Sequence, residues 1–174
     1  MSETVQPARP WLRIAFVTVP AIMILGSLSG YLSNSGFGNA WFDALVKPVF
    51  MPPGWAFGLV WPILYAMLGV ALAMVLAEPE SPRRLAVLTL FTIQLALNFA
   101  WSPIFFAAHD IALAKYVIAL MALLAALAAR QFLVVRRVAG LLMVPYLMWL
   151  VFAATLNTAI DNLNPGASTS LLGL

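Results

Sequence analysis

Four stretches without a charged residue constrain this chain more than any other feature of its sequence. They cover residues 14–42, 48–77, 85–108 and 138–160. Each is longer than the roughly 20 apolar residues with which an α-helix crosses the hydrocarbon core of a bilayer. The composition agrees, because 64% of the residues are hydrophobic and only 9% are charged. We therefore expect an integral membrane protein in contact with the lipid bilayer.

A fifth span is predicted between the third and fourth of these stretches, over residues 111–135. It contains Lys115 near one end and Arg130 near the other, where both side chains could reach the interface. The predicted fold class is an all-α bundle of five transmembrane helices that forms one domain over residues 1–174. The expected helices cover residues 12–33, 55–77, 84–107, 111–135 and 138–160, with a long first loop at 34–54.

The basic residues are distributed unevenly between the two sides of such a bundle. The side with the amino terminus and the second and fourth loops holds Arg9, Arg13, Arg83, Arg84, Arg130, Arg136 and Arg137. The other side holds Lys47 and Lys115. By the positive-inside rule, the amino terminus is expected in the cytoplasm, with the bacterial cell membrane as the predicted location. A cleaved signal peptide ending before Gly30 is the alternative reading of the first span.

Several kinds of chemistry lack the residues that they need. The chain has no cysteine and one histidine, His109, and no metal site is predicted. We expect His109 and Asp110 to form a solvated pair in a short turn. Catalytic triads and nucleotide-binding motifs are also missing, and ionisable groups are rare inside the spans, which disfavours a conventional pump. Topology explains most of the net charge of +3, so no nucleic-acid partner is expected.

The segment from Lys47 to Tyr65 joins a proline-rich loop to an aromatic helix. Prolines 52 and 53 suit the entrance to a helix, where backbone N–H groups have no intrahelical partner, so Trp55 falls in the first turn. Two strips follow at helical spacing, and one of them should face the bundle. The strips are Trp55 with Leu59 and Pro62 or Ile63, and Trp61 with Tyr65.

The third span carries two amides, Gln94 and Asn98, one turn apart. Buried amides need hydrogen-bond partners, and two readings remain open for Asn98. It either joins helices by hydrogen bonds or orients a ligand in an otherwise apolar pocket. Pro103 should loosen the helix nearby and leave one backbone carbonyl as a free acceptor.

Five of the six tryptophans divide into two groups. Trp11 and Trp41 lie near span ends, as residues of an interfacial aromatic belt do. Trp55, Trp101 and Trp149 instead lie beside prolines, within or near a helix body, and are expected to line a pocket. Flat rings stack on flat ligands, which contributes ~0.5–1.5 kcal/mol per ring beyond burial.

Three motifs resemble those of the TspO/MBR family, the tryptophan-rich sensory proteins. They are KPxxxPPxWxFxxxWxxLY at 47–65, QLALNxAWxPIFF at 94–106 and PYLxWxxFAxxLN at 145–157. The resemblance implies a homodimer of five-helix bundles with a cavity that opens toward the first loop, which acts as a lid. It also implies binding of porphyrins such as protoporphyrin IX and of isoquinoline carboxamide or benzodiazepine drugs, with no required cofactor. The implied ligand-binding residues are Trp55, Phe57, Tyr65, Asn98, Trp101, Phe105, Tyr146, Trp149 and Ala153.

The family offers more than one function for this chain. The first is a membrane receptor or sensor that binds tetrapyrroles and regulates their metabolism or a stress response. The alternatives are light- and oxygen-dependent porphyrin degradation, with Trp55 and Trp149 as catalytic residues, and passive translocation of small molecules. The sterol motif of the vertebrate relatives is broken here by Thr158 and Asp161. Lys115 is read either as an interfacial anchor or as a contact for a ligand carboxylate.

Overall fold

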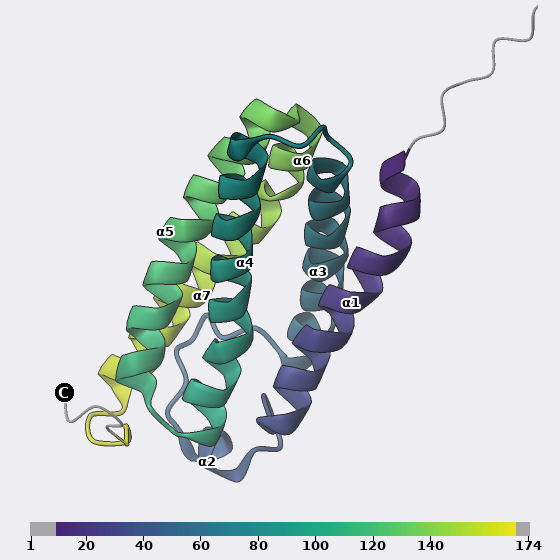
Figure 1. Cartoon of the computed structure of the whole chain (residues 1–174). Coiled ribbons are helices and arrows are strands. Elements are labelled where there is room, and N and C mark those ends of the chain that lie inside the picture. Colours follow the sequence, from purple (N-terminus) through teal and green to yellow (C-terminus); the bar gives the residue numbers. More distant parts are fainter. Residues whose placement is uncertain (1–9, 170–174) are drawn as a thin grey trace, which may run out of the picture.

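The computed structural model describes residues 10–169, and all regular secondary structure in that range is helical. Within these residues, five helical segments are long and apolar enough to cross a membrane, which confirms the predicted fold class. They run side by side as an elongated bundle (Figure 1). The helices are α1 Pro10–Leu32, α3 Gly54–Leu76, α4 Pro82–Ser102 with the π-helix η1 Pro103–Ala107, α5 Ile111–Val135, and α6 Arg137–Leu142 with α7 Val144–Leu163.

The last span differs from the single helix that was predicted, because it is divided into α6 and α7 at Met143. Pro145 lies in the first turn of α7. Proline lacks the N–H that would continue the hydrogen bonds of α6, but it fits the start of a new helix. The last span therefore consists of a short helix, α6, followed by a long one, α7.

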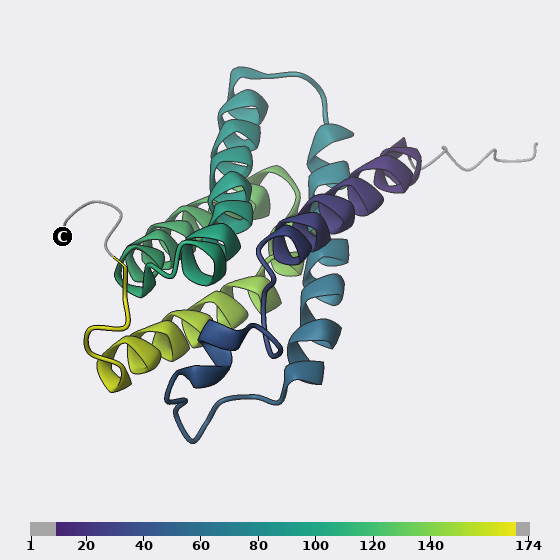
Figure 2. The same cartoon turned by 90° about the horizontal axis from the view of Figure 1, so that it is seen from below.

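The first loop contains a short helix that the sequence did not predict, α2 Ala40–Ala44. Asn39 caps it by accepting a hydrogen bond from the Phe42 backbone N–H at 3.1 Å. Phe42 is buried against Phe105 and Phe106 of η1. In the view from below, the loop with α2 passes across the ends of the helices (Figure 2). It therefore closes one end of the bundle.

Helix α1 packs on α3 at two points where a glycine allows close approach. At Gly69, a Cβ atom would lie 2.6 Å from the Cα of Val19, and Thr18 donates a hydrogen bond to the Gly69 carbonyl at 2.8 Å. At Gly26, a Cβ atom would lie 2.2 Å from the ring of Tyr65. The face of α1 around Gly26 is thus used for packing within the chain.

The π-helix follows directly from Pro103. Since Pro103 has no N–H, the Phe99 carbonyl one turn earlier has no helical partner. The Ser29 hydroxyl of α1 donates to this carbonyl. The Ala108 N–H then reaches back to the Pro103 carbonyl at 2.9 Å, which is the wider i→i+5 pattern. The predicted free acceptor at this point therefore joins α1 to α4.

Candidate ligand-binding cavity

A cavity of about 580 Å³ lies inside the bundle, next to the first loop. All five spans and the loop contribute to its wall, and most of the lining side chains are apolar or aromatic. Its volume falls within the range of roughly 300–1,000 Å³ that is usual for small-molecule sites. The predicted site residues in its wall are Phe57, Tyr65, Asn98, Trp101, Phe105, Trp149 and Ala153.

Flat rings form two parts of the cavity wall. On the α4–η1 side, Trp101 stacks on Phe105 with 5.0 Å between ring centroids and 22° between planes. On the α3–α7 side, Trp149 packs edge-to-face against Phe57 and Trp61, with ring centroids 5.7 Å and 6.5 Å apart. These rings offer extended apolar surfaces to a flat ligand.

A chain of four polar side chains runs through the bundle at the cavity wall. The Tyr65 hydroxyl donates to Asn98 Oδ1 at 2.9 Å, and Asn98 Nδ2 donates to the Tyr146 hydroxyl at 3.1 Å. Tyr146 in turn donates to Gln94 Oε1 at 2.9 Å. Asn98 thus joins α3, α4 and α7, which supports the interhelical reading of this residue. It also lines the cavity, and its amide retains one hydrogen and one lone pair for a ligand.

A second polar pair in the wall joins the predicted Trp101 to Asn157, which was not among the predicted site residues. Trp101 Nε1 donates to Asn157 Oδ1 at 3.2 Å, and Asn157 Nδ2 donates to the Ile111 carbonyl at 3.1 Å. Asn157 follows Trp149 and Ala153 at intervals of four residues, so all three share one face of α7. That spacing is the signal in the sequence from which Asn157 could have been assigned to the site.

Helix α3 shows the same regularity on its inner face. Phe57, Trp61 and Tyr65 recur every four residues and all line the cavity. The sequence placed Trp61 with Tyr65 on one of the two strips, without deciding which strip faces inward, and Trp61 was not assigned to the site. The strip with Tyr65 is therefore the one that faces the bundle.

Trp55 lies elsewhere, contrary to its prediction as a pocket residue. Trp55 is 71% exposed and is not part of the cavity wall. Leu59 and Ile63 of the same strip are also exposed, by 55% and 51%. Because α3 begins at Gly54, helical geometry turns this strip to the outside of the bundle. Tyr146 also differs from the prediction, since it is fully buried behind the wall and contacts Asn98 there.

Polar contacts hold the first loop to the end of α7 and also stabilise the loop internally. Asn164, directly after the end of α7, accepts from the Val46 N–H at 2.7 Å and donates to the Val46 carbonyl at 2.9 Å. The Lys47 ammonium group donates to three carbonyls of the loop itself, those of Phe42, Asp43 and Leu45. The loop segment that carries α2 is thus held against the end of α7.

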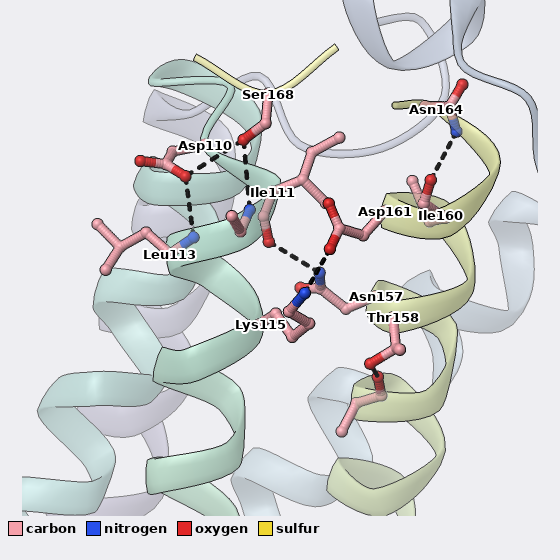
Figure 3. A network of polar contacts seen from close by, with 12 residues as sticks. Asp110, Ile111, Leu113, Lys115, Asn157, Thr158, Ile160, Asp161, Asn164 and Ser168 are labelled. Carbon is pink, nitrogen blue, oxygen red and sulfur yellow. Dashed lines mark hydrogen bonds and ion pairs between the residues drawn. The ribbon is translucent and has the colours of Figure 1, made fainter. Parts of the chain in front are cut away.

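The turn before α5 is more ordered than the solvated pair that was predicted. Asp110 is 2% exposed and caps α5 by accepting from the Leu113 N–H at 2.9 Å. It also accepts from the Ser168 hydroxyl at 3.3 Å (Figure 3). His109 stacks on Trp41 of α2 with 4.3 Å between ring centroids. The solvated-pair prediction was wrong for Asp110, because its carboxylate replaces missing backbone partners at the helix start.

Lys115 has a partner within the chain. Its ammonium group forms an ion pair with Asp161 of α7 (Figure 3). The pair links α5 to α7 beside Asn157, so Lys115 is neither an isolated interfacial anchor nor a free contact for a ligand. Residues 10–169 contain no group of three or more His, Cys, Asp or Glu side chains arranged to hold a metal ion.

Five membrane spans around a cavity with aromatic walls define a multi-pass membrane protein with a mostly apolar internal cavity. A sequence model described as "TspO/MBR family" matches residues 16–163. The chain belongs to the TspO/MBR family, as its three motifs indicated.

Relatives from animals and bacteria match most of the chain. It is 38% identical to the translocator protein of Sus scrofa, over 91% of this chain and 94% of that protein. It is 41% identical to the tryptophan-rich protein TspO of Chlorobaculum tepidum, over 72% of this chain and 80% of the relative. The tryptophan-rich sensory protein of Cereibacter sphaeroides is 38% identical over 72% of this chain and 78% of its own length.

Proposed function

We propose that this protein is a membrane receptor or sensor that binds porphyrin-type tetrapyrroles in the cavity and so regulates tetrapyrrole metabolism or a stress response. The observation that carries the proposal is the wall of flat rings around a cavity of about 580 Å³. A tetrapyrrole is a large, flat and mostly apolar molecule that such a wall would stack upon. The name of the Cereibacter sphaeroides relative, a sensory protein, supports the same class of function.

The proposed contacts follow from the two sides of the cavity. Trp101 and Phe105 would stack on one part of the macrocycle, and Phe57 and Trp149 would pack on another. Trp149 Nε1 is buried and has no hydrogen-bond partner in the described chain, so it is a donor available to a polar group of the ligand. Ala153 leaves room between these rings on the inner face of α7.

The amides would fix the orientation of the ligand. Asn98 lines the cavity with its remaining hydrogen and lone pair, and Tyr65 and Tyr146 hold it in place. Its expected role is therefore shared between joining helices and meeting the ligand. No contact with a ligand inside this cavity is proposed for Trp55.

Porphyrin degradation driven by light and oxygen is the second candidate. It is favoured by the sequence of rings from Trp149 through Trp61 to Tyr65, whose successive centroids lie 6.5 Å and 5.3 Å apart. Such rings could pass an oxidising equivalent away from a bound porphyrin. In this candidate function Trp149 is the catalytic tryptophan, and the exposed Trp55 has no part. Passive translocation, suggested by the name of the Sus scrofa relative, requires net flux across a membrane.

The proposal also covers the orientation of the protein in the membrane and its oligomeric state. The arginines of the second and fourth loops lie at the α6 end of the bundle, whereas Lys47 lies in the first loop at the opposite end (Figure 1). We place the α6 end, together with the start of α1, in the cytoplasm. We further propose a homodimer, formed through a face other than that of Gly26, which already contacts Tyr65.

The test is a titration of the purified protein with protoporphyrin IX, first in the dark and then under light. Tryptophan fluorescence should be quenched to saturation in the dark, with weaker binding in Trp149→Phe and unchanged binding in the matched control Trp55→Phe. Stable porphyrin under light would indicate a sensor. Bleaching that requires Trp149 but not Trp55 would indicate the degrading activity. Absence of saturable quenching would contradict the tetrapyrrole assignment.

A further inference from the structure

A second hollow lies on the outside of the bundle, between α3 and α7. It has a volume of about 370 Å³ and is lined by apolar side chains, including Val60, Ile63 and Met67 of α3 and Pro145 and Met148 of α7. These residues lie within the membrane spans, where hydrocarbon surrounds the bundle. The groove is therefore open to molecules that are dissolved in the bilayer.

Trp149 belongs both to this groove and to the internal cavity. Its ring lies against Phe57 and Trp61 of α3 on the cavity side. The two hollows are thus neighbours, and the indole of Trp149 is a partition between them.

The partition is held by apolar contacts, including those with the rings of Phe57 and Trp61, and by no hydrogen bond of its own. Among residues 10–169, no hydrogen bond or ion pair runs directly from α3 to α7, which are bridged only through Asn98 of α4, and Trp149 Nε1 has no partner. By contrast, Trp101 is tied to Asn157 through its indole N–H. A rotation of the Trp149 side chain between rotamers would therefore break no hydrogen bond.

The loop side of the cavity is fastened differently. Moving the loop away would break both hydrogen bonds between Val46 and Asn164. It would also break the contact of Asn39 Nδ2 with the Phe106 carbonyl at 3.4 Å and separate the stacked rings of Trp41 and His109. Opening at the loop thus costs several polar contacts, whereas opening at Trp149 costs none.

We propose that flat apolar molecules dissolved in the bilayer reach the cavity sideways, between α3 and α7, with the Trp149 ring as the gate. The proposal rests on the proposed function, because it concerns the path by which that ligand arrives. Loading would then draw on ligand concentrated in the membrane rather than in the aqueous phase.

The test measures release of protoporphyrin IX, since release and uptake share one path. Protein in lipid nanodiscs is saturated with porphyrin in the dark and mixed with excess empty vesicles, and release is followed by porphyrin fluorescence. Ile63→Trp fills the groove without touching the cavity. It should slow both uptake and release by about tenfold, equivalent to about 1.4 kcal/mol of barrier, and leave the equilibrium affinity unchanged.

Ile93→Trp on the outer face of α4 is the matched control, because Ile93 is 48% exposed compared with 51% for Ile63. Its release rate should equal that of the unsubstituted protein. An unchanged rate in Ile63→Trp would overturn the proposal.

A locked loop gives an independent measurement, even if Ile63→Trp fails to fold. The chain has no cysteine, so Val46→Cys and Asn164→Cys can be bridged specifically with a bifunctional maleimide. The sideways path predicts the same release rate before and after bridging. Release that stops on bridging would overturn it in favour of passage at the loop. Failure of the proposed function would look different, because the unsubstituted protein would then show no saturable binding at all.

Discussion

Asn98 is the residue on which the polar part of the cavity wall depends. It is buried, and its amide pairs with tyrosines from two other helices. Asn98→Leu keeps the size of the side chain but leaves the Tyr65 hydroxyl without its acceptor. We expect the free energy of unfolding to fall by about 1–3 kcal/mol, as for other buried groups that lose a partner. Thermal unfolding in detergent measures this change.

Tyr65→Phe is the matched control for that substitution. It leaves Asn98 Oδ1 without the Tyr65 donor but keeps the hydrogen bond from Asn98 to Tyr146, so its cost should be smaller, nearer ~0.6 kcal/mol. Equal stability of Asn98→Leu and the unsubstituted protein, together with a large loss of porphyrin affinity, would contradict the interhelical role and leave a ligand contact alone.

At the scale of elements, the end of α7 holds the first loop through Asn164. Asn164→Ala removes both hydrogen bonds to Val46. Backbone hydrogen exchange in residues 40–50 should then become faster by about tenfold, if each lost bond contributes about 0.5–1.5 kcal/mol. Asn162→Ala, an exposed position on the same helix end, should leave the exchange unchanged. Equal exchange in the two variants would show that the loop is held by its apolar contacts alone.

The sequence predicted elements better than it predicted which face each side chain occupies. Uncharged runs fix the spans because hydrocarbon excludes charge, and Pro52 and Pro53 fix the start of α3. The inward strip with Tyr65 could be distinguished from the outward strip with Trp55 only by packing, because both are aromatic and apolar. In a membrane both faces of a helix are apolar, so polarity does not mark the buried side.

Contacts between distant segments were also beyond the sequence. The pairing of Lys115 with Asp161 and the hydrogen bond from Asn39 Nδ2 to the Phe106 carbonyl depend on how the bundle closes. Gln94 and Asn98 could be identified as needing partners, but the partners Tyr65 and Tyr146 come from other helices.

For the whole molecule, the arginine distribution predicts one orientation in the membrane. Two exposed positions can report it, Glu80 in the turn between α3 and α4 and Val49 in the first loop. Each is replaced by cysteine in a separate variant, Glu80→Cys or Val49→Cys. In intact bacterial cells whose outer membrane has been made permeable, an impermeant maleimide should label Cys at position 49 and not at position 80. Labelling at position 80 alone would place the amino terminus outside the cytoplasm.

The central claim is that the ligand occupies the cavity between Trp101 and Trp149, and filling that space tests it most directly. Ala153→Trp adds an indole inside the cavity wall, whereas Ala126→Trp adds one on the exposed face of α5. The measurement is the dissociation constant for protoporphyrin IX in the dark, with thermal unfolding recorded for both variants. We predict that Ala153→Trp weakens binding by at least about tenfold, or about 1.4 kcal/mol, and that Ala126→Trp leaves it unchanged. A folded Ala153→Trp variant with unaltered affinity would contradict the account.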